Sequence, residues 1–227
     1  MYSVDELEDR LIDLAFAEDI GDGDHTTLCC IPEEAMGKSH LLIKEDGILA
    51  GVEVAKRVFA RFDPTMKVEV LMGDGTPVKK GDIAMVVTGK VRSLLQTERL
   101  MLNIMQRMSG IATMTNRYVK RLEGTKTHVL DTRKTTPGMR MLEKQAVKIG
   151  GGMNHRIGLV DMILLKDNHV DFAGGIKNAI TRCHEYLKEK NLDLKIELEV
   201  RNFDELNQAL EQGGINRVML DNFSVED

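Results

Sequence analysis

Residues 131–170 read DTRKTTPGMRMLEKQAVKIGGGMNHRIGLVDMILLKDNHV, and most of the charged residues that indicate a function stand in this stretch. Seven lysines and arginines stand here against four aspartates and glutamates, although the complete chain carries a net charge of −5. Most of these cations stand beside glycine, asparagine or threonine, or at the end of an apolar run. Cations gathered in this way are typical of a site for a small polyanion, because guanidinium and ammonium groups bind carboxylates and phosphates.

The same stretch begins an alternation of strands and helices that continues along the sequence. Strands are predicted at 129–130, 161–165, 195–200 and 217–220, and helices near 139–149, 172–190 and 203–212. Such an alternation predicts an α/β fold with parallel strands in a sheet or barrel. Polar or charged residues end or follow each strand, and in β/α barrels the carboxyl ends of the strands carry the chemistry. We therefore expect four separate segments to converge on one rim.

The rim offers two kinds of functional group. The candidate cations are Arg133, Lys134, His155, Arg156 and Lys166, with His169 as a further possible donor. Glu199 and Asp221 stand on neighbouring predicted strands and can hold Mg²⁺ directly or through its waters. This combination predicts a site for a sugar pyrophosphate with magnesium and for a second, carboxylated substrate. The three glycines at 150–152 can form a phosphate-binding nest, which is a weaker prediction from three residues alone.

The part of the chain before this stretch predicts further helices and strands. Helices are expected over 4–17 and 52–62, and strands over 38–45, 67–72 and 82–89. A long helix is expected from residue 93 to about 122, with Ser93 and Gln96 forming a capping box. Arg99 and Arg107 interrupt an otherwise apolar pattern in this helix, so each needs water or an anionic partner.

The composition excludes several classes of function. A pI near 5.7, aromatic residues at 4% and the absence of a basic stripe argue against nucleic-acid binding. No apolar run approaches the ~20 residues that span a bilayer, and the polar, acidic N-terminus is not a signal peptide. Cys29, Cys30 and Cys183 lack the spacing of a zinc site. We expect reduced thiols in a cytoplasmic protein, with no role assigned to the Cys29–Cys30 pair.

Several motifs together resemble the quinolinate phosphoribosyltransferase family. In chain order they are LLQTERLMLNIMQRMSGIAT, DTRKTTPG, GGGMNHR, LLKDNHV, IELEV and MLDNF, and the likeness covers essentially the whole chain. The resemblance implies an N-terminal α/β sandwich domain, placed over 1–92, followed by an incomplete β/α barrel domain with its linking helix over 93–227. It also implies a pentosyltransferase that works as a homodimer. Its substrates would be quinolinate and phosphoribosyl pyrophosphate, and its products nicotinate mononucleotide, carbon dioxide and pyrophosphate, with Mg²⁺, in de novo NAD synthesis.

The resemblance further implies roles for individual residues. Arg133, Lys134, His155, Arg156 and Lys166 would bind the quinolinate carboxylates, and the two lysines would also face phosphoribosyl pyrophosphate. Glu199 and Asp221 would lie near the ribose and its metal, and would form the catalytic set together with Lys134 and Lys166. Arg99, in QTER, would reach the active site of the partner subunit.

Members of this family continue past the MLDNF motif with further strands and a glycine-rich segment that holds the 5′-phosphate. Eight strands normally close a barrel, so we expect residues 93–227 to form an incomplete one and assign no residue to the 5′-phosphate. Two alternatives remain open: a paralogous phosphoribosyltransferase acting on another base, or a truncated, inactive binding protein. Titration with quinolinate distinguishes them, since a scaffold need not bind it and a paralogue would bind its own base.

Overall fold

The computed structural model describes residues 3–226. The chain forms two compact units, Met1–His155 (unit 1) and Arg156–Asp227 (unit 2), and each is described by itself. The predicted domain boundary at residues 92 and 93 lies inside unit 1, where the long helix packs on elements that both precede and follow it. That boundary stays a prediction.

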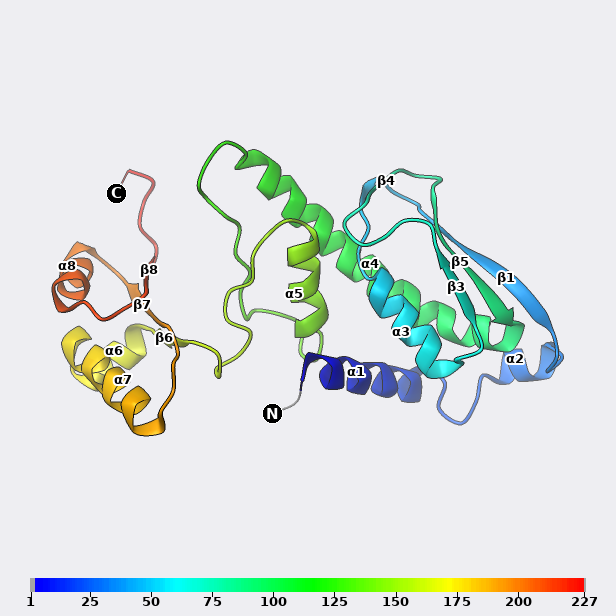
Figure 1. The fold of residues 1–227 in the computed structure, drawn as a ribbon, viewed down its shortest axis with the longest axis horizontal. Helices are drawn as coiled ribbons and strands as arrows, with labels where there is room; N and C mark the ends of the chain where they lie inside the picture. Colours follow the sequence, from blue (N-terminus) through cyan, green and yellow to red (C-terminus); the bar gives the residue numbers. More distant parts are fainter. Residues whose placement is uncertain (1–2, 227) are drawn as a thin grey trace. The chain divides into compact units, whose positions relative to one another are not determined.

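Unit 1 combines helices with a small antiparallel sheet (Figure 1). Its helices are α1 (Val4–Asp19), α2 (His25–Cys30), α3 (Val52–Phe62), α4 (Val91–Arg121) and α5 (Arg140–Ile149). Its strands are β1 (Met36–Leu42), β2 (Gly47–Ile48), β3 (Lys67–Val70), β4 (Pro77–Val78) and β5 (Ile83–Lys90). Strand β5 pairs with β1 on one side and with β3 on the other, and β2 pairs with β4. The mixed α/β class predicted from the sequence is confirmed.

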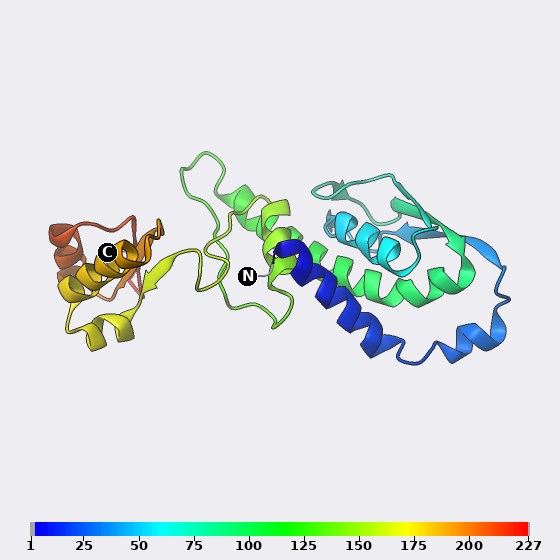
Figure 2. The ribbon, with the colours of Figure 1, turned by 60° about the horizontal axis from the view of Figure 1, so that its bottom comes forward.

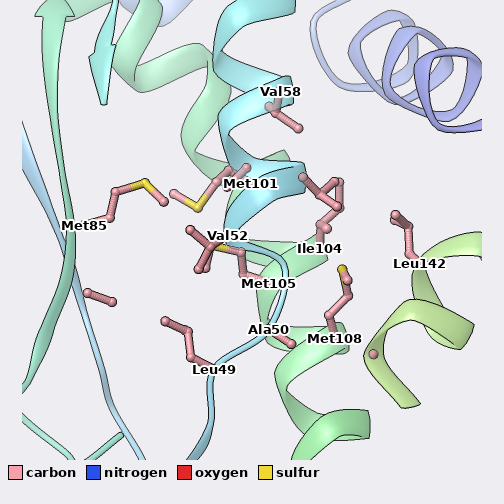
Figure 3. Close-up of a cluster of buried hydrophobic side chains, with 14 of the residues drawn as sticks. Leu49, Ala50, Val52, Val58, Met85, Met101, Ile104, Met105, Met108 and Leu142 are labelled. Carbon is pink, nitrogen blue, oxygen red and sulfur yellow. The ribbon is translucent and has the colours of Figure 1, made fainter. Parts of the chain in front are cut away.

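One hydrophobic core joins α3, α4 and β5 (Figure 3). Buried methionines supply much of it, namely Met85, Met101, Met105 and Met108. Methionine has three rotatable bonds and fills irregular gaps, which suits a core built from two crossing helices and a twisted strand. The core fixes α4 against α3, and α4 also packs on α5 and on strands β1, β2 and β5.

The predicted capping box at the start of α4 is wrong. The helix begins directly after β5, with Lys90 at the N-cap position and with the Val91 N–H donating to Ala35 O at 2.8 Å. Ser93 lies inside the helix, where its hydroxyl donates to Asp63 Oδ2 at 2.6 Å. The hydroxyl therefore ties α4 to the end of α3 instead of capping its own helix.

Two of the three consecutive glycines allow α5 to end against α4. The backbone N–H groups of the three glycines donate to carbonyls of α5 and are therefore not arranged as the phosphate nest considered above. A Cβ at Gly150 would meet the carbonyl oxygen of Ala112 and lie 2.8 Å from Thr115 Cβ. A Cβ at Gly152 would lie 2.8 Å from Val147 Cγ1 and 2.9 Å from a methyl carbon of Thr115. Glycine is favoured at both positions because it has no Cβ, so the end of α5 can lie close to α4.

We expect Gly150→Ala to destabilise unit 1 by about 2 kcal/mol or more, because the backbone of α4 cannot move aside as a flexible side chain could. Thermal unfolding measures this loss. The matched control is Gly110→Ala in the middle of α4, where a Cβ would meet nothing within 4 Å among the described residues. That change should stabilise the protein by up to about 1 kcal/mol. Equal effects of the two substitutions would contradict this packing.

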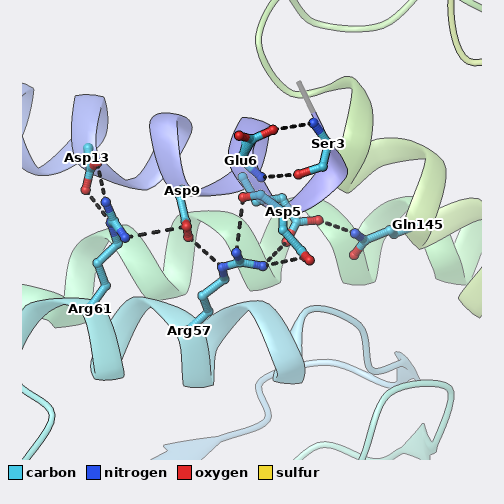
Figure 4. A network of polar contacts seen from close by, with 9 residues as sticks. Ser3, Asp5, Glu6, Asp9, Asp13, Arg57, Arg61 and Gln145 are labelled. Atoms are coloured by element: carbon cyan, nitrogen blue, oxygen red, sulfur yellow. Dashed lines mark hydrogen bonds and ion pairs between the residues drawn. The ribbon is translucent and has the colours of Figure 1, made fainter. Parts of the chain in front are cut away.

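A network of ion pairs holds α1 against α3 (Figure 4). Arg57 of α3 contacts Asp5, Glu8 and Asp9 of α1, with Nε 2.6 Å from Asp9 Oδ1. One turn further along α3, Arg61 pairs with Asp13. The Arg57 hydrogen bond lowers the pKa of Asp9, whereas burial raises the pKa of Glu8.

Replacing Arg57 by alanine is expected to lower the free energy of unfolding by about 1–3 kcal/mol at pH 7, since the buried carboxylate of Glu8 then loses its cation. A carboxyl with a lowered pKa contributes stability above its ordinary pKa, here 3.8, and loses it as pH falls through the folded value. The difference between wild type and Arg57→Ala should therefore shrink below pH 3.8 in thermal unfolding. The control Lys56→Ala removes a cation that pairs with exposed Glu53, and should change little.

Unit 2 is a three-stranded parallel sheet with helices packed on it (Figures 1 and 2). Its elements are β6 (Ile163–Leu165), α6 (Asp167–Ala173), α7 (Ile176–Lys190), β7 (Ile196–Val200), α8 (Phe203–Gln212) and β8 (Arg217–Leu220). Strand β7 lies between β6 and β8, and alternate residues of β7 pack with α7 and α8 in a second hydrophobic core. The described strands of unit 2 form an open sheet, in agreement with the predicted incomplete barrel.

Two details of unit 2 differ from the prediction. The predicted strand at 129–130 belongs to unit 1, where Leu130 forms an isolated bridge with Met153, so it is not a strand of this sheet. The predicted helix over 172–190 is broken, because Gly174 and Gly175 adopt positive φ and end α6 before α7 begins. Within residues 3–226, no helix combines the length and apolar character needed to cross a bilayer.

Candidate functional site

The carboxyl ends of the three parallel strands bring Lys166 and Glu199 together in unit 2. Ile196, Leu198 and Val200 of β7 are buried in the core with the helices, so the alternate residues Glu197 and Glu199 face the other side of the sheet. Lys166 follows β6 directly, and its Nζ lies 3.2 Å from Glu199 Oε2. The Glu199 side chain is 12% exposed and that of Lys166 is 48% exposed. The pair therefore places one cation and one anion at the same accessible edge of the sheet.

Asp221 stands at the same edge, directly after β8. Its N–H donates to Val200 O at 2.9 Å, which extends the pairing of β8 with β7. Asn222 takes a left-handed conformation with φ of 57°, and its amide donates to Asp221 Oδ2 at 3.1 Å. This turn fixes the Asp221 carboxylate at the end of the strand.

His169 also supports the backbone beside Lys166. Its Nδ1 accepts the backbone N–H of Lys166 at 3.0 Å, which leaves Nε2 as the donor of the ring. The contact closes the first turn of α6 and holds the backbone from which the Lys166 side chain extends. His169 thus positions Lys166 at the end of β6.

In unit 1, Arg133 and Lys134 lie in the loop that connects residue 131 to α5. The Nε of Arg133 is buried and has no hydrogen-bond partner among the described residues. Lys134 is exposed, and its backbone N–H donates to Thr132 Oγ1 at 3.0 Å. A buried guanidinium N–H without an acceptor is costly, so its presence indicates an acceptor supplied from outside the chain.

His155 and Arg156 stand on either side of the boundary between the two units. The backbone N–H of His155 donates to Asp131 Oδ1 at 2.8 Å in unit 1. Arg156 donates from Nη1 to Met162 O at 3.3 Å in unit 2. The predicted site residues are therefore divided between the units, and their convergence on one rim stays a prediction.

Arg99 lies on an exposed face of α4 that the sequence pattern did not separate from the buried one. It lines a groove of about 1130 Å³ in unit 1, between β1 and α4, together with Leu95, Leu102 and Gln106 at helical spacing. Met101 and Met105, which pack into the core, also line this groove, so Arg99 stands at the border of the core-facing side of α4. Arg99 is exposed and forms no ion pair within residues 3–226.

Residues that hold the Arg133 loop were not identified as functional from the sequence. Arg107 of α4 contacts Glu143 Oε1 from Nε at 3.0 Å and from Nη2 at 2.6 Å, and Nη2 also donates to Thr136 Oγ1 at 2.8 Å. Glu143 accepts the Thr136 N–H as well, at 3.3 Å. Arg107 thus has the anionic partner that the sequence required of it. Glu143 could have been recognised in the sequence as a carboxylate on the apolar face of a short predicted helix.

No preformed metal cage exists in the described part of the chain. Within residues 3–226, no group of three or more histidines, cysteines, aspartates or glutamates could hold a metal ion. Cys29 and Cys30 are exposed free thiols with their sulfur atoms 3.4 Å apart. Any divalent cation at Glu199 and Asp221 would need further oxygen ligands from water or from a bound substrate.

Comparison with known protein families gives matches along most of the chain. The family model described as quinolinate phosphoribosyl transferase, N-terminal domain, matches residues 24–109, and the corresponding C-terminal domain matches residues 111–227. The nicotinate-nucleotide pyrophosphorylase (carboxylating) of Arabidopsis thaliana is 45% identical over 95% of this chain and 63% of its own length. The quinolinate phosphoribosyltransferase (decarboxylating) 1b of Nicotiana tabacum is 43% identical over the same shares. The chain thus spans 63% of the length of these relatives.

Solved structures give the same result. NadC from Streptococcus pyogenes superposes with a TM-score of 0.90 at 38% identity, over 100% of this chain and 78% of that one. The nicotinate-nucleotide pyrophosphorylase from Francisella tularensis gives a TM-score of 0.90 at 40% identity over the same shares. These similarities confirm the family resemblance that the sequence motifs indicated.

Proposed function

The chain belongs to the quinolinate phosphoribosyltransferase family, and we propose that the protein transfers a phosphoribosyl group from phosphoribosyl pyrophosphate to quinolinate and decarboxylates the product. The products are nicotinate mononucleotide, carbon dioxide and pyrophosphate. The observation that carries the proposal is the buried Nε of Arg133, which has no acceptor among the described residues. A substrate carboxylate supplies that acceptor, and Arg binds carboxylates with two parallel N–H donors.

The quinolinate subsite is assigned to Arg133, Lys134, His155, Arg156 and Lys166. Two adjacent carboxylates on one small ring need several cations, because each charge loses its water on binding. Lys134 and Lys166 are exposed enough to reach a ligand, whereas Arg133 is half-buried and sets the orientation.

Glu199 and Asp221 are assigned to the ribose of phosphoribosyl pyrophosphate. Displacement at the anomeric carbon builds positive charge on the ring, and carboxylates held at fixed positions stabilise that charge. Lys166, 3.2 Å from Glu199, can move its contact to an anionic substrate group while the carboxylate turns to the ribose. The contact between the two residues before substrate binds therefore keeps both charges satisfied.

Magnesium is proposed as the metal, and the residues present fit it. Mg²⁺ is usually held by one or two carboxylates together with waters and substrate phosphates, and Glu199 and Asp221 provide two carboxylates at one sheet edge. When bound, the ion neutralises the pyrophosphate leaving group. The lysines share this task, and they also hold the quinolinate carboxylates while the carboxylate next to the ring nitrogen departs as carbon dioxide.

A homodimer is proposed from the groove that Arg99 lines. Leu95 and Met114 of α4 line the groove and are 44% and 49% exposed, so the groove presents apolar side chains beside Arg99. A second copy of the chain would cover this surface, and each Arg99 would reach the quinolinate subsite of its partner. This sharing gives the exposed arginine an anionic partner.

A cytoplasmic location is also proposed. Cys29, Cys30 and Cys183 are all free thiols, which suits a reducing compartment. Some plant relatives are named as chloroplastic or mitochondrial proteins.

Calorimetric titration of the full-length protein with quinolinate and with nicotinate tests the proposed function. We expect saturable binding of quinolinate, and binding of nicotinate at least about 30-fold weaker because one carboxylate is missing. Preference for another base would indicate a paralogous phosphoribosyltransferase. Failure to bind any pyridine carboxylate would indicate an inactive binding protein, and either result would contradict the proposal.

A further inference from the structure

We propose that Asp131 and Lys144 form a buried charge pair that positions the quinolinate subsite and keeps Asp131 away from its cations. Lys144 Nζ donates to Asp131 Oδ1, and the two side chains are 3% and 8% exposed. Neither residue is among those assigned to bind substrate. The inference rests on the proposed function, because it names what holds Arg133, Lys134 and His155 in place for that reaction.

Asp131 connects two segments that are distant in the sequence. Besides Lys144, its Oδ1 accepts the His155 N–H at 2.8 Å, and its own N–H donates to Met153 O at 3.2 Å. With its amide nitrogen facing the acceptors, Asn154 donates to Asp131 Oδ2 at 2.8 Å and to Lys144 O at 2.9 Å. One carboxylate thus holds the segment before Arg133 and the segment that carries His155.

Lys144 completes this arrangement from helix α5. Its Nζ also donates to His155 O, at 3.2 Å, so Asp131 and Lys144 contact the N–H and the carbonyl of the same residue. The backbone of His155 is held from both sides. Because rotation at this residue would change the direction of the His155 side chain, the pair fixes part of the subsite geometry.

The pair also has an electrostatic consequence. Asp131 stands two and three residues before Arg133 and Lys134 in the chain. A carboxylate at that position without its own cation would attract those two residues, and it would compete with the carboxylates of the substrate. Lys144 neutralises Asp131 inside the protein, so Arg133 and Lys134 remain available to a ligand.

The test uses the double variant Asp131→Asn with Lys144→Met. Each single change leaves a buried charge without a partner and should lower the unfolding temperature strongly, whereas the double change removes both charges and should recover most of it. With the fold recovered, we expect quinolinate to bind at least about 10-fold more weakly and kcat/KM to fall by about 100-fold. Affinity for phosphoribosyl pyrophosphate should fall less than affinity for quinolinate, since Lys134 is the only residue of the positioned set that is also assigned to that substrate.

A matched control and a second variant keep the result interpretable. Lys148→Met replaces an exposed lysine one turn further along α5 and should change neither ligand affinity nor stability. Asn154→Ala removes the contact to Asp131 Oδ2 but leaves the charge pair, and should weaken quinolinate binding about 3-fold or more, with a smaller effect on phosphoribosyl pyrophosphate. It serves as the test if the double variant does not fold.

Hydrogen exchange separates this inference from the proposed function. In the double variant, the His155 amide should exchange at least about 10-fold faster than in wild type, while the amides of α7 are unchanged. If wild type fails to bind quinolinate but the His155 amide responds in this way, the proposed function fails and the positioning role stands. A folded double variant with wild-type quinolinate affinity and wild-type exchange at His155 would overturn the inference.

Discussion

Replacing Lys134 or Lys166 by alanine is expected to lower kcat of the full-length protein by about 100- to 1,000-fold, the range for removing one fixed electrostatic stabiliser. Both side chains are accessible and neither contributes to a hydrophobic core, so the fold should persist. Each ammonium group acts on negative charge that grows during departure of pyrophosphate and during decarboxylation. Loss of an interaction that strengthens in the transition state lowers kcat more than it raises KM.

Steady-state kinetics with each substrate varied gives the two parameters separately, and circular dichroism checks the fold. Lys177→Ala is the matched control, because Lys177 is an exposed lysine of α7 in unit 2. Near-normal turnover in both active-site variants would remove Lys134 and Lys166 from the catalytic set. A rise in KM without loss of kcat would reassign them to uniform substrate binding.

Mixing two inactive variants is expected to restore activity if Arg99 acts in the partner subunit. Dimers of Arg99→Ala alone and of Lys134→Ala alone should each be nearly inactive. After random subunit exchange about half the dimers carry one subunit of each kind, and one of the two sites in such a dimer has both residues intact. Recovery should therefore approach about a quarter of wild-type activity.

Native mass spectrometry establishes whether the subunits exchange. The control mixture combines Lys134→Ala with Lys166→Ala. The proposal assigns Lys134 and Lys166 of one chain to the same site. Each site of a mixed dimer then lacks one of these two lysines, so the control mixture should stay inactive. Exchange without recovery in the Arg99 mixture would place Arg99 in its own subunit's site or outside any site.

The sequence predicted most helices and strands because their periodicity and packing agree. Helix α8 and strand β8 have the predicted bounds, since each has a clear start and end in turn residues. Two of the errors arose where a tertiary contact replaced a local one. Ser93 bonds to Asp63 and not to its own helix, and the glycines at 150 and 152 serve packing against α4.

Most residues of the candidate site were predicted from the family motifs, and fewer from the pattern of strands and charges alone. Strand ends alone indicated Lys166, Glu199 and Asp221, and the structure places these three at one edge of the sheet. The support of the Arg133 loop by Glu143 and Lys144 could not be derived from the sequence. Both are charged residues buried between segments far apart in the chain, and a sequence pattern gives no sign of which charge pairs with which.

The most direct test of the proposed function follows the carboxylate carbon. Quinolinate labelled with carbon-13 in the carboxylate next to the ring nitrogen is incubated with the full-length protein, Mg²⁺ and phosphoribosyl pyrophosphate. The proposed reaction predicts one labelled carbon dioxide for each nicotinate mononucleotide, with none formed when phosphoribosyl pyrophosphate is left out. A product that retains the label, or release of labelled carbon dioxide without phosphoribosyl pyrophosphate, would contradict it.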